Sequence, residues 1–194
     1  MTSNATTGRR RVYTGKVINL DVDSIRFPDG SAGELEIIRH PGASAVVPVL
    51  GPLLQADPQL ILIRQYRYAA SGFLYEIPAG RLNPGERPEE CARRELWEEV
   101  GCTASELTFL TTAFTTPGFT DERIHFFLAA GLTPGEPHRE ADEFIEVETM
   151  PLSRALDMVK RGEIQDAKTM LGLLYVASFR QGLRGTHAEA KGNR

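Results

Sequence analysis

The chain has 194 residues, long enough for one domain of ordinary size with a modest additional element. Its apolar content of 41% and charged content of 25% are ordinary for a globular protein. The net charge of −4 argues against a broad surface for nucleic acid or an anionic membrane, and no apolar run reaches transmembrane length.

The first forty residues predict short strands that cannot form a core of their own. Residues 1–8 are polar and are expected to lack regular structure. Apolar positions within 12–22 and 25–27 predict strands, Pro28-Asp29-Gly30 predicts a turn, and 34–39 predicts the returning strand. Three strands are too few to bury a core. Region 1–42 is therefore expected to pack against the rest of the chain or a second subunit.

The main domain is expected over residues 43–180, followed by a polar, flexible tail at 181–194. The strand predicted at 60–67 is almost continuously apolar, so it is expected to be central. Strands and helices mix along the chain, which predicts an α/β (α+β) fold. The other predicted strands are 45–50, 73–77, 107–114, 123–130 and 143–149, and the helices after the motif described next are 152–161 and 166–180.

The most informative segment is a glycine loop that leads into a carboxylate-rich helix. It has the pattern Gly80-x5-Glu86-x7-Arg94-Glu95-Leu96-x-Glu98-Glu99-x-Gly101. A helix places the carboxylates at 95, 98 and 99 on one face. Pro88 favours the helix start, and Gly101 supplies a left-handed stop. Like charges this close repel unless a cation neutralises them, and clustered oxygen ligands suit Mg²⁺ or Mn²⁺.

This segment resembles the Nudix box, and every fixed position of that pattern is filled. A solvated acidic helix is the alternative interpretation, but it explains neither Gly80 nor Gly101. The resemblance implies an α/β/α sandwich with a mixed central sheet, to which the N-terminal antiparallel strands are added. It also implies hydrolysis of a nucleoside diphosphate that is linked to another group.

The carboxylates of the segment are expected to bind two or three Mg²⁺ or Mn²⁺ ions. Glu95 and Glu99 are the expected principal ligands, and Glu98 completes the cluster. The family pattern implies that the backbone carbonyl of Ala79 is a further ligand. Glu86 is expected to orient the loop or to bind metal through water.

Residues outside the box indicate the substrate. Pro117 lies 16 residues after Gly101, within the segment Thr-Pro-Gly-Phe-Thr-Asp-Glu at 116–122. This segment resembles the ADP-ribose pyrophosphatase branch of the family, which implies that Gly118 and Phe119 contribute to substrate binding. A plain turn is the alternative, because Pro-Gly is a common turn pair.

Two arginines of the central strand, Arg64 and Arg67, are candidates for binding phosphate, because a guanidinium can bond two oxygens at once. In relatives, the residues that match Arg67 and Glu76 lie at the substrate. Side chains alternate along a strand, so the two arginines are expected to face opposite sides. Arg67 is the preferred candidate, and an ordinary strand-edge arginine is the alternative.

The remaining catalytic candidates are a general base and Arg94. Members of this branch place a glutamate from the loop near 134–142 over the substrate, which makes Glu143 the leading candidate and Glu140 the second. A solvent-facing acidic loop is the alternative. Arg94 is expected to pair with a box carboxylate and to set its rotamer.

The resemblance as a whole implies metal-dependent hydrolysis of ADP-ribose to AMP and ribose 5-phosphate. Other nucleoside diphosphate sugars, such as GDP-mannose and ADP-glucose, are alternative substrates. A ligand-sensing module without turnover is the alternative from another class, but such modules usually lose box glutamates or carry a DNA-binding extension. The resemblance also implies a homodimer in which the N-terminal strands pack across the partner.

The two cysteines, Cys91 and Cys102, flank the predicted helix. About eleven residues of helix span about 16 Å, which is beyond the reach of a disulfide. Free thiols favour a reducing compartment, and the polar N-terminus lacks the apolar core of a signal peptide. We therefore expect a cytoplasmic protein.

Overall fold

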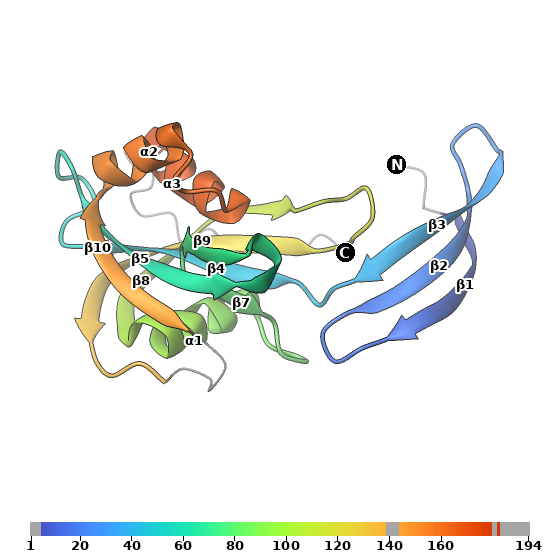
Figure 1. Ribbon diagram of the computed structural model, residues 1–194, viewed down its shortest axis with the longest axis horizontal. Coiled ribbons are helices and arrows are strands. Elements are labelled where there is room, and N and C mark those ends of the chain that lie inside the picture. The colour runs from blue at the N-terminus through green and yellow to red at the C-terminus, as the bar shows by residue number, and fades with distance from the viewer. Residues whose placement is uncertain (1–4, 139–143, 180–181, 183–194) are drawn as a thin grey trace. The chain divides into compact units, whose positions relative to one another are not determined.

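The computed structural model describes residues 5–138, 144–179 and 182, which fold into two compact units (Figure 1). Unit 1 comprises Met1–Gly42 and Ala113–Ile124, and unit 2 comprises Ala43–Thr112 and His125–Arg194. None of the helices in the described residues combines the length and the apolar character that crossing a membrane requires.

Unit 1 contains a three-stranded antiparallel sheet in the order β1-β2-β3. Its strands are β1 (Ala5–Thr14), β2 (Asn19–Arg26) and β3 (Ala32–Arg39). The turn predicted at Pro28-Asp29-Gly30 is confirmed, and Gly30 adopts a φ of 87° there. Residues 5–8 were expected to lack regular structure, which is wrong: they pair with the end of β2. Polar residues can form a strand here because β2 supplies partners for their backbone groups.

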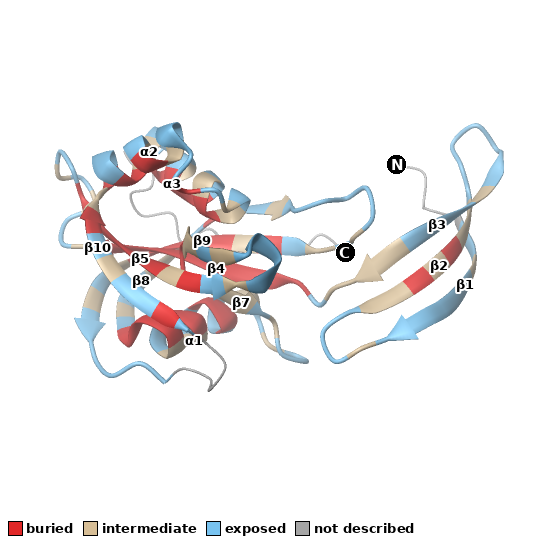
Figure 2. Cartoon of the chain, viewed as in Figure 1, coloured by how far each residue is buried: buried red, intermediate tan, exposed pale blue. Residues whose placement is uncertain are grey.

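The N-terminal sheet has no apolar core of its own. Among the described residues of β1 to β3, only Asp21 and Asp23 of β2 are buried (Figure 2). Arg11 and Arg39 donate hydrogen bonds to Asp21, and Arg9 and Arg39 donate to Asp23. The interior of this sheet is therefore held by ion pairs, which is how buried carboxylates are usually satisfied.

Unit 2 is built on a seven-stranded mixed sheet in the order β10-β5-β4-β9-β8, in which β6 also pairs with β5 and β7 with β4. The strand predicted to be central, β5, has β10 on one edge and β4 and β6 on the other. The strands are β4 (Ala43–Leu50), β5 (Gln59–Arg67), β6 (Gly72–Glu76), β7 (Ala79–Arg81), β8 (Cys102–Phe114), β9 (Arg123–Pro134) and β10 (Ile145–Pro151).

Helices cover both faces of this sheet, which confirms the predicted sandwich (Figure 1). Val46 of β4 and Leu96 of α1 (Pro88–Val100) belong to the same buried apolar cluster, so this face of the sheet packs against α1. The next residue of β4, Val47, lies beside Gly172 of α3 (Ala167–Phe179). Successive side chains of a strand point to opposite faces, so α1 and α3 lie on opposite sides. The remaining helices are α2 (Leu152–Arg161) and the short 3₁₀ turn η1 (Tyr68–Ala70).

Strand boundaries differ from the prediction where the residues are polar. β8 begins at Cys102 rather than near 107. Residues 103–106 were not predicted as strand because they carry no apolar alternation. A Cβ on Gly131 would lie 2.0 Å from the Oγ of Ser105, which shows how closely β9 approaches this part of β8. β7 was expected only as a loop, and it forms because residues 79–81 pair with the start of β4.

Candidate active site

The carboxylate-rich helix α1 begins and ends where its sequence predicts. Pro88 is its first residue, and Glu90 accepts a hydrogen bond of 3.0 Å from the N–H of Arg87. Gly101 follows the last residue with a φ of 74°, and its N–H donates to the carbonyl of Trp97 at 2.9 Å. These end contacts fix which side chains share a face of the helix.

Arg94 is bonded to three of the carboxylates. Its Nε donates to Glu86 at 2.8 Å, and one terminal nitrogen donates to Glu95 at 2.6 Å and to Glu98 at 2.9 Å. These contacts raise the pKa of Arg94, with the hydrogen bond to Glu86 as the largest cause. The same bond lowers the pKa of Glu86. The guanidinium thus orients the three carboxylates.

Glu95 and Glu99 are the most buried carboxylates of α1, with exposed fractions of 7% and 2%. Glu99 accepts a hydrogen bond of 2.9 Å from the N–H of Ala79. A Cβ on Gly80 would lie 1.8 Å from an oxygen of Glu95, so only glycine allows that carboxylate to lie against β7. The spacing of the segment is explained, because Gly80 makes room for Glu95.

The donor set of this cluster fits a hard divalent cation. Glu86, Glu95 and Glu98 contact the guanidinium of Arg94, Glu99 contacts the N–H of Ala79, and all of their ligand atoms are oxygen. Within the described residues, no three acidic, histidine or cysteine side chains are already gathered around one point. Arg94 and the Ala79 N–H hold these oxygens instead, so a cation would take over part of those bonds.

A second polar cluster joins β5, β6 and α3. Arg67 donates to both oxygens of Glu76, at 2.7 Å from Nε and 2.8 Å from a terminal nitrogen. The ammonium of Lys168 also donates to Glu76, and to Asp166 at 2.9 Å. Glu76 has an exposed fraction of only 1%. A carboxylate this deeply buried is stable because two cations satisfy it.

The ionisation of this cluster follows from its contacts. Burial raises the pKa of Glu76, but the hydrogen bond from Arg67 and the charge of Lys168 outweigh it, so the pKa lies below its ordinary value. The hydrogen bond to Glu76 raises the pKa of Arg67, and the charge of Glu99 contributes. Because Glu99 acts on Arg67, the second cluster lies within the electrostatic range of the α1 carboxylates.

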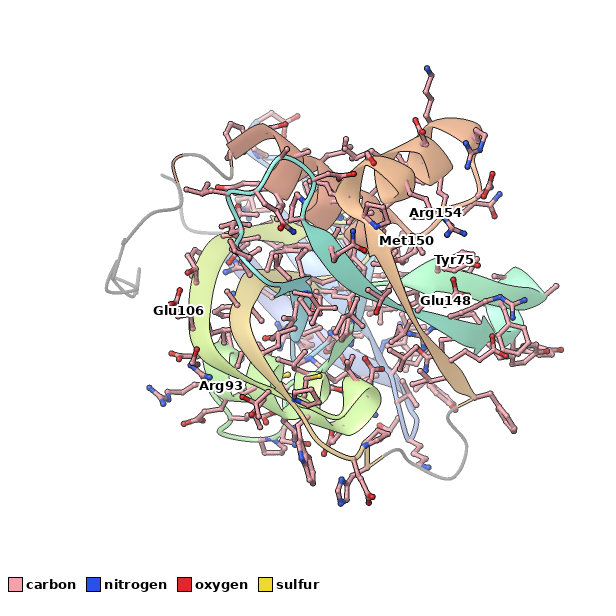
Figure 3. The ribbon with its side chains drawn as sticks, turned by 90° about the vertical axis from the view of Figure 1, so that its left-hand side faces the viewer. Tyr75, Arg93, Glu106, Glu148, Met150 and Arg154 are labelled. Carbon is pink, nitrogen blue, oxygen red and sulfur yellow. The ribbon has the colours of Figure 1, made fainter. Side chains whose placement is uncertain are left out.

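The two arginines of β5 face opposite sides of the sheet, as the alternation predicted. Glu76 pairs with Ile63, and Arg67 lies four residues after Ile63 on β5, so Arg67 and Glu76 share a face of the sheet. Arg64 pairs with Tyr75 and therefore lies on the other face. Arg64 donates to Glu146 at 2.9 Å. On the same face, the Tyr75 hydroxyl donates to Glu148 at 3.2 Å (Figure 3). Arg64 therefore belongs to a solvent-facing ion pair, and Arg67 to the face that carries Glu76.

The other predicted site residues lie elsewhere or outside the described residues. Gly118 and Phe119 belong to unit 1, where they line an open cavity of about 530 Å³ together with Arg10. Their expected part in substrate binding stays a prediction. Glu140 and Glu143, the candidate bases, lie outside the described residues.

Two contacts at the site had no clear signal in the sequence. Lys168 belongs to no recognisable sequence motif. A lysine in the first turn of a helix is unfavourable for the helix dipole, and this could have indicated a carboxylate partner nearby. The ring of Trp97 stacks on His138 with centroids 4.0 Å apart, and the N–H of His138 donates to the carbonyl of Glu98 at 3.0 Å. His138 therefore connects the segment after β9 to α1.

Comparison with known proteins supports this picture. A model of the NUDIX domain family matches residues 43–172. The ADP-ribose pyrophosphatase of Bacillus subtilis is 42% identical over 173 residues, which cover 88% of this chain and 91% of that protein. The methanol dehydrogenase activator of Bacillus methanolicus is 36% identical over 168 residues, covering 86% and 88%. A crystal structure of an ADP compounds hydrolase shares the fold, with a TM-score of 0.78, 24% identity and coverage of 94% and 96%.

Proposed function

This chain belongs to the Nudix family, and we propose that it hydrolyses the diphosphate bond of ADP-ribose to give AMP and ribose 5-phosphate. One observation carries the choice of substrate: the 42% identity to an ADP-ribose pyrophosphatase extends over 88% of the chain. The excess of carboxylates around Arg94 supports the reaction class, because diphosphate hydrolysis requires positive charge that these side chains can recruit.

The carboxylates of α1 would hold the divalent ions of the reaction. We assign Glu95 and Glu99 as principal ligands, Glu98 as the third, and Glu86 and the carbonyl of Ala79 as further contributors to two or three Mg²⁺ or Mn²⁺ ions. Bound divalent ions neutralise phosphate oxygens and lower the pKa of water. The protein supplies the orientation, because Arg94 and the Ala79 N–H fix the carboxylates before any ion binds.

The diphosphate is assigned to Arg67 rather than Arg64. Glu76 engages Nε and one terminal nitrogen of Arg67, which directs the other edge of the guanidinium away from the carboxylate. That edge can donate to two phosphate oxygens at once. Removal of the proton from the attacking water is assigned to Glu143, with Glu140 as the alternative base.

We further propose that the protein is a cytoplasmic homodimer in which the N-terminal strands contact the partner. The sheet of unit 1 buries no apolar side chain among its described residues, and Val12, Tyr13 and Leu35 are 50%, 55% and 40% exposed. An exposed apolar surface of this kind is typical of an interface. Light scattering tests the proposal, and a monomer would contradict it.

A product screen tests the function. ADP-ribose, GDP-mannose and ADP-glucose are each incubated with the protein and Mg²⁺ or Mn²⁺ in ¹⁸O-labelled water. We expect AMP and ribose 5-phosphate from ADP-ribose at the highest kcat/KM, with the label in whichever product carries the attacked phosphorus. Higher efficiency with release of a sugar 1-phosphate would favour the nucleotide-sugar alternative. ADP-ribose that binds but gives no product with metal present would indicate a sensing module.

A further inference from the structure

We propose that Lys168 is a positioning residue for substrate binding. By holding Glu76 from the α3 side, it fixes the guanidinium of Arg67 so that the outer edge of Arg67 faces the diphosphate. The proposal rests on the proposed function for the identity of the substrate. It adds a residue from the last helix to a site whose other members come from β5, β6 and α1.

Both carboxylate oxygens of Glu76 already accept hydrogen bonds. One accepts from Nε of Arg67, and the other accepts from a terminal nitrogen of Arg67 and from Lys168. A carboxylate offers about four lone-pair sites, so Glu76 has little capacity left for a ligand. Its role is to hold Arg67, and its own position depends on the cation behind it.

Lys168 is itself held firmly. Its side chain is 14% exposed, and its ammonium also donates to Asp166 at 2.9 Å. Asp166 accepts from the N–H of Thr169 at 2.9 Å, and the Thr169 hydroxyl accepts from the N–H of Ile77 at 2.8 Å. The first turn of α3 is thus tied to the residue that directly follows Glu76.

Arg67 and Lys168 balance Glu76 and Asp166, so the group of four is neutral as it stands. Without the lysine, Glu76 would keep a single cation and would lose the contact that fixes its carboxylate from the α3 side, so Arg67 would be held less firmly. An arginine that has lost its fixed direction binds a diphosphate less well, because ordering it costs side-chain entropy at the moment of binding.

The position of Lys168 in its helix supports a role beyond the helix itself. It is the second residue of α3, near the positive end of the helix dipole, where a cation is unfavourable. Its contacts with Glu76 and Asp166 offset that cost. Lys160, in the last turn of α2, lies where the dipole favours a cation, which makes it a matched control.

The test is a double-mutant cycle on binding rather than turnover. The dissociation constant of ADP-ribose is measured by calorimetry in EDTA for the wild type, Lys168→Met, Arg67→Met and the double variant. We expect each single change to weaken binding roughly tenfold, and the double variant to bind no more weakly than Arg67→Met alone. Lys168→Arg is expected to restore part of the affinity, and Lys160→Met to change nothing.

The outcomes separate the alternatives. If Lys168→Met weakens binding by the same factor in the Arg67→Met background, the lysine acts on the substrate directly and the proposal is wrong. A lower Tm with unchanged affinity would show a purely structural role and would also overturn it. Lys168→Gln replaces Lys168→Met if the latter does not fold.

Binding of inorganic pyrophosphate serves as a second probe, because it requires neither sugar nor base. Non-additivity with pyrophosphate, together with a wild type that does not split ADP-ribose, would refute the proposed substrate and leave the positioning role standing. Additivity with both probes would refute the positioning role whatever the substrate is.

Discussion

Both units contain a network of arginines and carboxylates, but the two networks differ in balance. In unit 1 three guanidiniums face three carboxylates: Arg9, Arg11 and Arg39 contact Asp21, Asp23 and Asp121. In unit 2 the guanidinium of Arg94 contacts three carboxylates of the Nudix box, Glu86, Glu95 and Glu98. A network with equal numbers of arginines and carboxylates needs no further charge, whereas a network with an excess of carboxylates favours the binding of a cation.

The surroundings of the two networks explain why they can differ. Unit 2 has an aliphatic core formed by residues such as Val46, Ile63 and Leu96, and its burial is spread over the sheet and helices (Figure 2). Burial of this apolar surface is the main stabilising contribution in unit 2. In the N-terminal sheet of unit 1, Asp21 and Asp23 are the only buried side chains among the described residues. The ion pairs of that sheet therefore replace a core, and those of unit 2 are available for chemistry.

The largest effect is expected from Glu99→Gln, which removes one of the two carboxylates assigned as principal metal ligands. Turnover should fall at least about a hundredfold, because an amide is a poorer ligand for a hard cation than a carboxylate. The Tm should stay within a few degrees, since a repulsive charge is removed and the amide oxygen of glutamine can still accept from the N–H of Ala79. Steady-state kinetics and a thermal melt measure both.

Glu89→Gln is the control for that experiment. Glu89 lies on the same helix, is exposed and pairs with Arg93 rather than Arg94. Its turnover should equal that of the wild type. Normal turnover in Glu99→Gln would remove the metal assignment.

A smaller effect, on stability, is expected from Arg39→Met in the balanced network. Arg39 contacts Asp21, Asp23 and Asp121, so its loss leaves two buried carboxylates with fewer partners. The Tm should fall by several degrees, as followed by circular dichroism. Arg10→Met, on the same sheet with no ion pair among the described residues, should change it little. Equal melts for the two variants would contradict the structural role of the network.

A still smaller effect is expected in the pH dependence of the Tm, through the buried carboxylates of unit 1. The hydrogen bond from Arg11 lowers the pKa of Asp21, and although burial raises that of Asp23, its arginine partners lower it overall. Their contribution to stability is complete above the ordinary value of 3.8 and is lost as the pH falls through the lowered pKa of the folded state. Acid titration of the Tm should show a loss beginning below about pH 4. The loss should be smaller in Arg39→Met, because weaker pairing brings the pKa of the two carboxyls in the folded state closer to the ordinary value. A loss of the same size in that variant would contradict the assignment.

The smallest effect concerns the thiols. Burial raises the pKa of Cys91 to about 11, and it also raises that of Cys102. A thiol is nucleophilic only as the thiolate, so Ellman's reagent at pH 8 should react with neither until denaturant is added. Activity should be the same with and without reductant. Fast release of one equivalent from the native protein would show that a cysteine is accessible.

Local signals made α1 predictable. Pro88, Gly101 and the spacing of the glutamates are read within one short segment, and the structure confirms the start, the end and the shared face of the helix. The opposite facing of Arg64 and Arg67 was predictable for the same reason, because alternation along a strand is a local property. The predicted sandwich followed from the family resemblance.

Contacts between distant residues were not predictable. Lys168 and Glu76 are 92 residues apart, and only the fold brings them together. The same holds for residues 5–8, whose strand structure depends on pairing with β2 rather than on their own polar sequence. Arg94 was expected to have one carboxylate partner, and its three partners follow from the return of the Gly80 loop to the helix face.

The link between Glu76 and the first turn of α3 has a consequence for how the protein matures on the ribosome. Synthesis proceeds from the N-terminus, so every carboxylate of α1 emerges well before Lys168. A chain that ends between residues 101 and 167 would contain every carboxylate of α1 but would lack Lys168 and α3. If Lys168 positions Arg67 as proposed, the substrate site is complete only after the last helix of the chain has been made and has docked.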